Sequence, residues 1–508
     1  MIAPPSSRAF PHPLPGGWLI ALLVGWLGVD QLLLWRFLDV MPFWAYGLGA
    51  LLIGVLCVAI VRSSRSFAGP APATWLLCIG VATMLLLLGG EGRFFYANID
   101  WQVRFAVLRD ISVNPWPFVY TARGEPDVLR APIGMFLMPA LAAKALGGRS
   151  GDIILLVQNS LLLGTLLALG STLFATRRAR LIALAVVIGF SGLDALGRVL
   201  FRGGLSDHLE NWAYLQYSST ITLAFWVPQH ALSGWIGALA FLLWRAEKLP
   251  LGVYLTLLPL TALWSPLGLI GAMPFAALAG VRSLSARAIR PADIALPAIA
   301  TLLCIPGLLY LSAAGDGVGA KLVAILPLQW ALFELLEILV YVLPLAFLVR
   351  QPRFGKDSLA VLTLWLLAIP FLQIGSSTDF MMRGSICALT ILAVTVADVV
   401  RTVSPARPWL LLALSIGVMT PLTEIRRALV YPPAPEVRCS FIKAWEGSFW
   451  FQPKDTYLAP LDRMPSLVRP TNPYRASAVE PDRCWNGAWH HPDKPDVPLS
   501  SGQDRINR

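Results

Sequence analysis

Long apolar runs are the feature of this sequence that most constrains its fold. The chain is 56% hydrophobic and only 14% charged, and its apolar runs recur as far as residue 430. Soluble domains carry about 25% charged residues, whereas a run of about 18 or more apolar residues is typical of a helix that crosses a bilayer. The runs lie at about 17–36, 43–61, 73–90, 152–174, 181–199, 221–244, 293–313, 330–349, 358–375, 385–400 and 408–430.

These runs predict an all-α fold, a polytopic transmembrane helix bundle with about 11–13 spans. A transmembrane β-barrel would alternate polar and apolar residues, and these runs do not. The stretch 250–281 is interrupted at Trp264-Ser265-Pro266, so we expect two short helices there. No small-residue cleavage site follows the first run, which favours a retained anchor over a signal peptide.

Basic clusters between the runs predict the orientation of the bundle. Loops rich in Lys and Arg remain on the cytoplasmic side, and all the clusters can lie there if 131–148 is a short interfacial helix that does not cross. The N-terminus is then cytoplasmic and the C-terminal tail lies outside. The net charge of +11 therefore indicates contact with anionic lipid headgroups rather than with nucleic acid. The clusters are Arg62 and Arg65; Arg177, Arg178 and Arg180; Arg245 and Lys248; Arg282, Arg287 and Arg290; Arg350, Arg353 and Lys356; and Arg401 and Arg407.

The composition divides the chain into three parts. Residues 1–72 hold the first membrane spans, and 73–430 form the transmembrane core with a large outer loop at 91–151. Residues 431–508 mix Pro, Arg, Asp and aromatic residues without periodicity, which predicts a soluble tail. Two of the six cysteines, Cys439 and Cys484, lie in this tail and could pair outside the cytoplasm.

The outer loop begins with the strongest local pattern. Glu91 ends a span and Asp100 lies about nine residues beyond it; Trp101, Phe105 and Leu108 follow at helical spacing, flanked by Arg104 and Arg109. This pattern predicts an amphipathic helix at the membrane surface. Asp100 could act as a general base while the two arginines hold an anionic lipid-linked donor, with Glu91 and Trp101 as substrate contacts. The alternative is an anchoring helix with no chemistry.

A second pattern joins polar residues to the run 221–244. His208 and Glu210 precede this run, and Gln229 and His230 lie inside it. Polar side chains at membrane depth usually face a cavity or a partner, so all four are candidate substrate-binding residues. His230 could equally be a hydrogen-bonded packing residue. His208 and Glu210 have no further ligand at metal spacing nearby, so we expect no zinc site.

The third pattern is an ionic pair at the head of a helix. Asp379 and Arg383 stand at i, i+4, where a salt bridge can form. Either the pair caps the helix, or Arg383 reaches a phosphate while Asp379 orients it. The sequence contains no nucleotide-binding glycine loop and no zinc-protease or nucleophile-elbow motif. Any chemistry must therefore use a membrane-embedded or outward-facing substrate.

These stretches together resemble a known group of proteins. NIDWQVRFAVLRDISVNPWPFVY, HLENWAYLQYSSTITLAFWVPQHALSGW, SPLGLIGAMPF and DFMMRGSICALTIL resemble a poorly characterised family of bacterial multispanning proteins of surface-polysaccharide loci. The layout is similar to that of GT-C glycosyltransferases, with an acidic outer loop, interfacial helices, a bundle and an outer C-terminal segment. The resemblance covers most of residues 91–400 in order.

The resemblance implies a glycosyltransferase at the periplasmic face of a bacterial inner membrane. Its donor would be a polyprenyl-phosphate-linked sugar and its acceptor a glycan or glycolipid, with Asp100 as base and Arg104 and Arg383 on the donor phosphate. Asp100 is a single carboxylate where several GT-C families have a paired one, so a divalent metal (Mg²⁺ or Mn²⁺) stays an open cofactor. The alternatives are a flippase or transporter of a lipid-linked glycan, a polysaccharide polymerase or ligase, and a non-enzymatic scaffold.

Overall fold

The computed structural model describes residues 12–313, 319–375, 377–449, 454–477, 481, 483–487 and 489, and it is mostly helical. The helices of the first half are α1 (Gly16–Leu38), α2 (Phe43–Ser63), α3 (Pro72–Leu88), η1 (Glu91–Arg93), α4 (Ile99–Val113), α5 (Gly134–Leu146), α6 (Ser150–Ser171), α7 (Arg177–Ile188), α8 (Asp194–Arg202), α9 (Thr220–Trp226) and α10 (Pro228–Arg245). Those of the second half are α11 (Leu251–Leu260), α12 (Pro266–Ser285), α13 (Pro291–Ser312), α14 (Pro327–Glu334), η3 (Leu335–Leu339), α15 (Val340–Leu348), α16 (Lys356–Ala368), η4 (Ile369–Phe371), α17 (Asp379–Gly384), α18 (Ile386–Val400), α19 (Arg407–Gly417), α20 (Met419–Val430), α21 (Phe441–Ser448), η5 (Lys454–Thr456), η6 (Leu461–Arg463) and η7 (Ser466–Val468).

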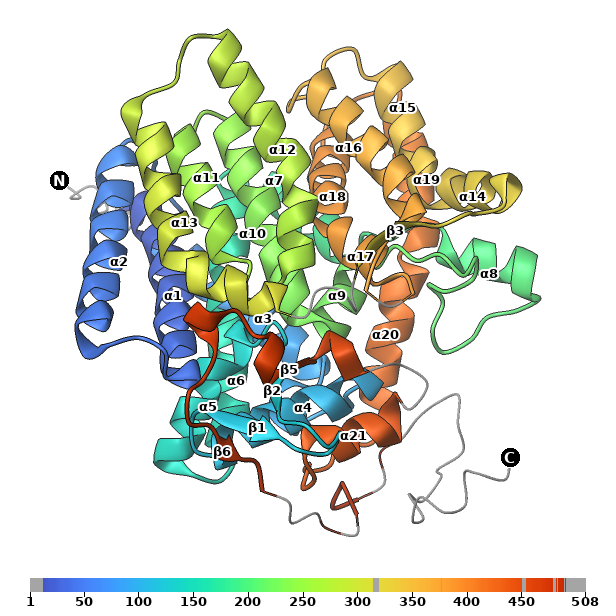
Figure 1. Cartoon of the computed structure of the whole chain (residues 1–508). Helices are drawn as coiled ribbons and strands as arrows, with labels where there is room; N and C mark the ends of the chain where they lie inside the picture. Colours follow the sequence, from blue (N-terminus) through green and yellow to red (C-terminus); the bar gives the residue numbers. More distant parts are fainter. Residues whose placement is uncertain are drawn as a thin grey trace, which may run out of the picture.

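Several of these helices are apolar and long enough to span a bilayer. Figure 1 shows the bundle that the helices form. Shorter apolar helices such as α3, α11 and α18 pack among them. The interruption predicted at Trp264-Ser265-Pro266 is confirmed, because it separates α11 from α12. Of the two short helices expected there, α11 is short with 10 residues, whereas α12 has 20 residues and is itself a candidate span. The count of about 11–13 spans stays a prediction. Within the described residues the seven candidate spans are Gly16–Leu38, Phe43–Ser63, Ser150–Ser171, Pro266–Ser285, Pro291–Ser312, Pro327–Leu348 and Arg407–Val430.

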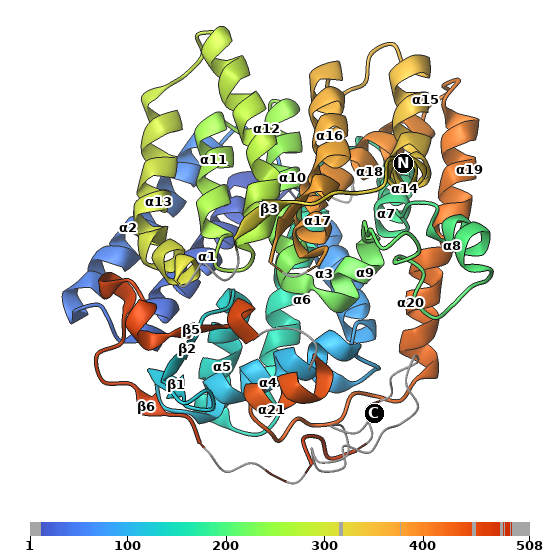
Figure 2. The ribbon, with the colours of Figure 1, turned by 45° about the vertical axis from the view of Figure 1, so that its right-hand side comes forward.

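Three runs predicted as single spans are broken in the structure. The run 358–375 is helical through α16 and η4 and then ends in the strand Leu372–Ile374. The run 221–244 divides into α9 and α10 at Val227, because Pro228 has no N–H to continue the hydrogen bonding of α9 and instead begins α10. The run 181–199 divides into α7 and α8, and Figure 2 shows α8 at the edge of the bundle. At the break between α9 and α10, the carbonyl of Trp226 accepts a hydrogen bond from Arg104.

The basic loops meet at one end of the bundle, here called the basic end. Asp357 pairs with Arg245 (2.8 Å) and Arg282 (2.6 Å), and Asp398 pairs with Arg353 (3.1 Å) and Arg401 (2.7 Å). These pairs connect loops that are up to about 100 residues apart in the chain. The shared location agrees with the expectation that these clusters lie on one side of a membrane.

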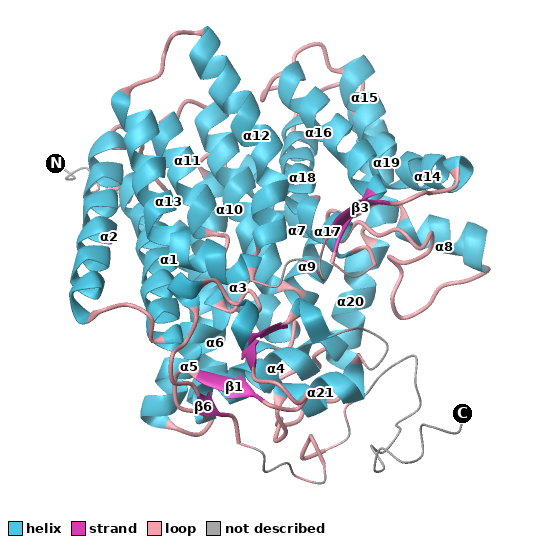
Figure 3. Ribbon diagram, in the orientation of Figure 1, coloured by secondary structure: helices cyan, strands magenta, loops and turns pink. Residues whose placement is uncertain are grey.

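A smaller layer covers the opposite end of the bundle, and we call it the cap layer (α4, α5, α21 and strands β1, β2, β5 and β6). Figures 1 and 3 show it beneath the long helices. Its sheet has the order β5-β2-β1-β6, in which β1 pairs antiparallel with β2 and parallel with β6, and β2 pairs antiparallel with β5. The strands are β1 (Phe118–Tyr120), β2 (Asp127–Leu129), β5 (Leu458–Pro460) and β6 (Tyr474–Arg475); a separate antiparallel pair joins β3 (Ala320–Leu322) to β4 (Leu372–Ile374).

The cap layer joins the outer loop 91–151 to the C-terminal tail. Asp110 of α4 is buried and accepts hydrogen bonds from the Tyr120 hydroxyl (2.7 Å) and from the Phe441 N–H (2.8 Å). Burial raises the pKa of Asp110 to about 6, against these hydrogen bonds and Arg109. Cys439 and Cys484 form a disulfide, so the pairing considered from the sequence is present. The tail is therefore packed against the loop through much of its described length.

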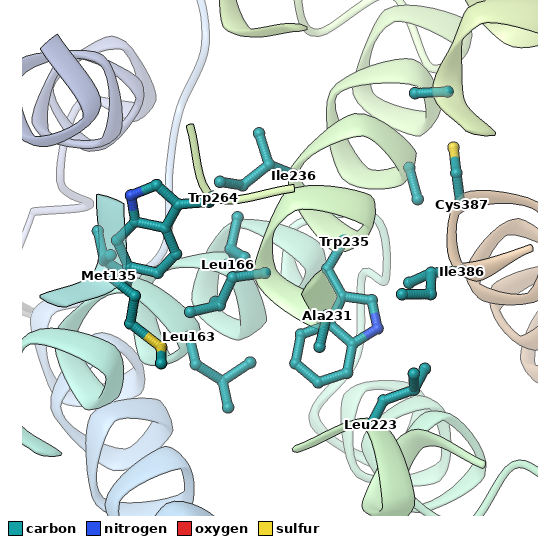
Figure 4. Close-up of a cluster of buried hydrophobic side chains, with 14 of the residues drawn as sticks. Met135, Leu163, Leu166, Leu223, Ala231, Trp235, Ile236, Trp264, Ile386 and Cys387 are labelled. Atoms are coloured by element: carbon teal, nitrogen blue, oxygen red, sulfur yellow. The ribbon is translucent and has the colours of Figure 1, made fainter. Parts of the chain in front are cut away.

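Apolar side chains fill the space between the cap layer and the bundle. Figure 4 shows Met135 of α5 beside Leu163 of α6 and Trp264, with Trp235 of α10 close to Ile386 of α18. All of these side chains are less than 9% exposed. This core holds α10 at the centre of the molecule, where its first turn faces the cap layer.

Candidate functional site

A cavity of about 310 Å³ lies where the cap layer meets the bundle. Its walls come from α4, the segment between α8 and α9, the α9–α10 break, the start of α12, α17 and the tail. Six residues that the sequence singled out line it together: Asp100, Arg104, His208, His230, Asp379 and Arg383. Three patterns separated by more than 100 residues thus converge on one place.

The first wall carries the Asp100–Arg104 pair on α4. The Asn98 side chain caps this helix by accepting the Asp100 N–H (3.0 Å), which fixes Asp100 in the first turn. The Arg104 guanidinium lies 3.0 Å from the Asp100 carboxylate and also donates to the carbonyl of Trp226 at the α9–α10 break. Arg104 is only 3% exposed, so α4 does not present it to an outer surface.

A second pair of the same kind lies on α17. Arg383 is 2.5 Å from Asp379, which confirms the predicted i, i+4 salt bridge. Both Arg104 and Arg383 keep a buried Nε that has no hydrogen-bond partner among the described residues. Most buried polar groups in folded proteins are hydrogen-bonded, so these two donors remain available to a ligand. Nε of Arg198 and Nε of Arg427, which do not line the cavity, are also buried without a partner among the described residues.

His230 stands in the first turn of α10. Its Nδ1 is 2.8 Å from the Ser265 hydroxyl, and that hydroxyl also accepts the Gly268 N–H (2.9 Å) as the cap of α12. The interruption that separates α11 from α12 therefore also orients this histidine. The sequence left its role open between packing and substrate contact, and the structure places it in the cavity wall with a fixed ring.

His208 belongs to a hydrogen-bonded group that includes Glu424 of α20 and Trp226 at the end of α9. Its Nδ1 is 3.1 Å from Glu424 of α20, and the Trp226 indole donates to the same carboxylate (2.8 Å). Arg427, one turn along α20, also contacts this carboxylate (2.9 Å). The His208 ring packs on the Trp226 ring with centroids 4.9 Å apart.

The tail supplies an aromatic wall. Trp445 and Phe449 of α21 and Tyr457 line the cavity, with the Trp445 ring 5.4 Å from that of Phe449 and 5.1 Å from that of Tyr457. Burial raises the pKa of Tyr457, opposed by the nearby positive charges of Arg104 and Arg383. The tyrosine hydroxyl therefore lies close to both cavity arginines.

Five of the other residues nominated from the sequence lie outside the cavity wall. Glu91 is buried and accepts from Asn159 (2.9 Å), and Trp101 is buried and donates to the Phe225 carbonyl (2.7 Å). Arg109 pairs with its neighbour Asp110 (2.8 Å) and Gln229 is buried within α10. Glu210 accepts the Ser219 N–H (2.8 Å), and burial raises its pKa to about 7. These groups support the structure around the cavity.

Sequence reasoning missed Glu424, Trp445 and Tyr457. Glu424 had a signal, because a carboxylate and Arg427 interrupt the apolar run 408–430, and ionisable residues in such runs often have a functional partner. Trp445 and Tyr457 had no such signal, because the tail sequence shows no periodicity from which their position near the cavity could be predicted.

The described residues contain no group of three or more His, Cys, Asp or Glu side chains placed to hold a metal ion. A divalent metal held between protein carboxylates and a bound substrate stays a prediction. No protein-family model, curated protein or solved structure matches the chain.

Proposed function

We propose that this protein is a membrane glycosyltransferase that takes its sugar from a polyprenyl-phosphate-linked donor at the outer face of a bacterial inner membrane. The observation that carries the proposal is the pair of cavity arginines, Arg104 and Arg383, each with a buried Nε that no described residue satisfies. Arginine presents a planar fork of donors that matches phosphate oxygens. A donor phosphate between them would satisfy both groups.

The other walls suit the remaining parts of such a substrate. Trp445, Phe449 and Tyr457 offer flat apolar faces beside polar groups, a combination typical of sites that bind an amphipathic ligand. Asp100 and Asp379 balance the arginine charges in the free protein. A donor phosphate would compete with these carboxylates for the guanidinium groups; Asp100 is the base nominated from the sequence.

Two observations support an outward-facing cavity. The cavity lies at the cap layer, away from the basic end, and loops rich in Arg and Lys remain in the cytoplasm. The Cys439–Cys484 disulfide lies in the same layer, and disulfides persist outside the reducing cytoplasm. The proposed acceptor is therefore a glycan or glycolipid of the cell envelope. A polysaccharide polymerase or ligase would use the same topology with a different acceptor.

A transporter of a lipid-linked glycan is the second candidate, and one observation favours it. Glu334 and Glu337 are buried in the candidate span Pro327–Leu348, where ionisable residues often mark ion or proton pathways. A proton-coupled transporter would move a labelled lipid-linked glycan between leaflets of a liposome and would lose this movement in Glu337→Gln. A glycosyltransferase would not depend on such movement.

A transfer assay in lipid tests the proposal. Purified protein in nanodiscs receives radiolabelled polyprenyl-phosphate sugars and a membrane extract as acceptor, and binding of unlabelled polyprenyl phosphate is measured in parallel. We expect transfer by the wild type, loss of transfer with retained binding in Asp100→Asn if Asp100 is the base, and weakened binding in Arg383→Gln. Wild-type protein that neither binds polyprenyl phosphate nor transfers any sugar would overturn the proposal.

A further inference from the structure

The cavity lining contains a second group suited to moving a proton, His208, in the segment between α8 and α9. His208 is 20% exposed at its side chain and lines the cavity, while Glu424 behind it is 5% exposed. Nδ1 of His208 is engaged by Glu424, and Nε2 makes no hydrogen bond to any residue that the structure describes. A carboxylate that holds one ring nitrogen fixes the orientation of the ring and leaves the other nitrogen for chemistry.

Glu424 is itself held in place from three sides. It contacts His208 and Arg427 through Oε1, and it accepts the Trp226 indole N–H through Oε2. Neither oxygen lacks a partner, so this carboxylate is committed to positioning the ring. Removing it would leave the ring of His208 without its hydrogen bond and the indole of Trp226 without an acceptor.

Trp226 connects this group to the proposed phosphate site. Its carbonyl accepts from Arg104, its indole donates to Glu424, and its ring packs against His208. A continuous set of contacts therefore runs from Asp100 through Arg104, Trp226 and Glu424 to His208. This arrangement fixes the position of the histidine relative to the arginine that would hold the donor phosphate.

We propose that His208, positioned by Glu424, accepts the proton of the acceptor hydroxyl during glycosyl transfer, an inference that rests on the proposed function. Nε2 takes the proton as the acceptor oxygen bonds to the anomeric carbon. The bond between that carbon and the phosphate oxygen breaks, and the leaving polyprenyl phosphate keeps the electron pair. The imidazolium is stabilised by Glu424 until it releases its proton to water. His208 thereby takes the role for which the sequence nominated Asp100, whose carboxylate is engaged by Arg104.

The charges around His208 agree with this role. Burial opposes the charged ring, but the hydrogen bond and charge of Glu424, with Glu210 nearby, outweigh it and raise the pKa of His208. Arg427 of α20 acts in the opposite direction, and Asp194 of α8 lies near enough to interact with the ring. A base must be neutral before it accepts a proton, so transfer should rise with pH along a limb whose midpoint lies above about 6.5, the ordinary value for His.

The test compares variants in the nanodisc transfer assay, with binding of polyprenyl phosphate as the readout of an intact cavity. We expect His208→Asn to bind polyprenyl phosphate within about twofold of wild type and to lower transfer about 10²- to 10⁴-fold, the usual range for a general base. Glu424→Gln should lower transfer and move the rising limb of the pH profile to lower pH. Glu446→Gln, an exposed carboxylate of the cap layer paired with Lys454 (2.5 Å), is the matched control and should leave the limb in place.

Each outcome decides the inference. Undiminished transfer by His208→Asn in a protein whose wild type is active would overturn it while leaving the proposed function intact. If His208→Asn fails to fold, the pH limb of Glu424→Gln decides alone, and an unmoved limb would count against the histidine. A wild type that shows no transfer and no polyprenyl phosphate binding would overturn the proposed function and this inference together.

Discussion

Arginine–aspartate pairs occur at both ends of this molecule, and they differ in whether Nε of the arginine has a hydrogen-bond partner. At the basic end, Nε of Arg245 donates to the Phe354 carbonyl (2.8 Å) and Nε of Arg401 donates to its carboxylate partner (3.1 Å). In the cavity, Nε of Arg104 and Nε of Arg383 are buried without a described partner. The chemistry of the pairs is the same, but among these described pairs the buried Nε without a partner belongs to the cavity arginines.

This difference in the hydrogen bonding of Nε distinguishes ion pairs that hold loops together from ion pairs that line a proposed binding site. The basic-end pairs join loops and are partly exposed, with Arg282 50% exposed at its side chain, so solvent screens them. The cavity pairs are enclosed by the tail, where a missing hydrogen bond costs about 1–3 kcal/mol. Such a cost is removed when a ligand supplies the acceptor. The following variants test whether the two ends differ in this way.

The largest effect on stability is expected from removing the disulfide of the tail, which packs against the cavity end of the molecule. The double variant Cys439→Ser/Cys484→Ser should destabilise the cap layer by about 2–4 kcal/mol, because the disulfide limits the unfolded chain. Hydrogen exchange should then increase in α4 and α21 but not in α16 or α18. Cys57→Ser, which replaces a half-buried free thiol in α2, is the control. Equal exchange at both ends would show that the tail does not hold the cavity together.

A cavity arginine should matter more for binding than a basic-end arginine. Arg383→Gln should weaken polyprenyl phosphate binding about 10- to 100-fold, since a hydrogen bond to a charged group contributes about 1.5–3 kcal/mol. Arg401→Gln, which also removes an ion-paired arginine, should leave binding unchanged. Titration of each variant in nanodiscs measures both values. Similar losses in the two variants would indicate a general effect of charge.

The smallest effect is expected for an exposed pair. Arg282→Ala removes one of the two arginines on Asp357, while Arg245 remains in contact. Exposed ion pairs contribute about 0–1 kcal/mol, so the thermal midpoint in detergent should change little and transfer should be unaffected. A large fall in the thermal midpoint would mean that the stability of the basic end depends on its ion pairs as strongly as the stability of the cavity depends on its own.

The local predictions from the sequence were the successful ones. The break between α11 and α12 and the Asp379–Arg383 pair both depend on neighbours within a few residues, and both are present. The run 221–244 was predicted as one helix, and its division at Pro228 shows that hydropathy alone does not register a backbone break. Seven candidate spans are present in the described residues. The predicted count of about 11–13 spans would require shorter apolar helices to cross the bilayer as well, and the length of a helix alone does not identify such crossings.

Tertiary structure decided which residues share the cavity. His208 and Glu424 are 216 residues apart, and Tyr457 approaches Arg104 from the far end of the chain. The sequence nominated Arg109 as readily as Arg104, because both follow Asp100 on one helix. The structure separates them, since Arg109 pairs with Asp110 while Arg104 turns to Trp226.

The sequence by itself determined that this chain has the character of a multi-pass membrane protein, and it determined where local ion pairs can form. Apolar runs, basic clusters and i, i+4 spacing act over one or a few helical turns, so their consequences can be read without knowing the fold. Only the tertiary structure decided that α4, α17, α20 and the tail enclose one cavity. The physical reason is that packing across hundreds of residues depends on how helix faces and strand edges pair, and no local pattern specifies that pairing.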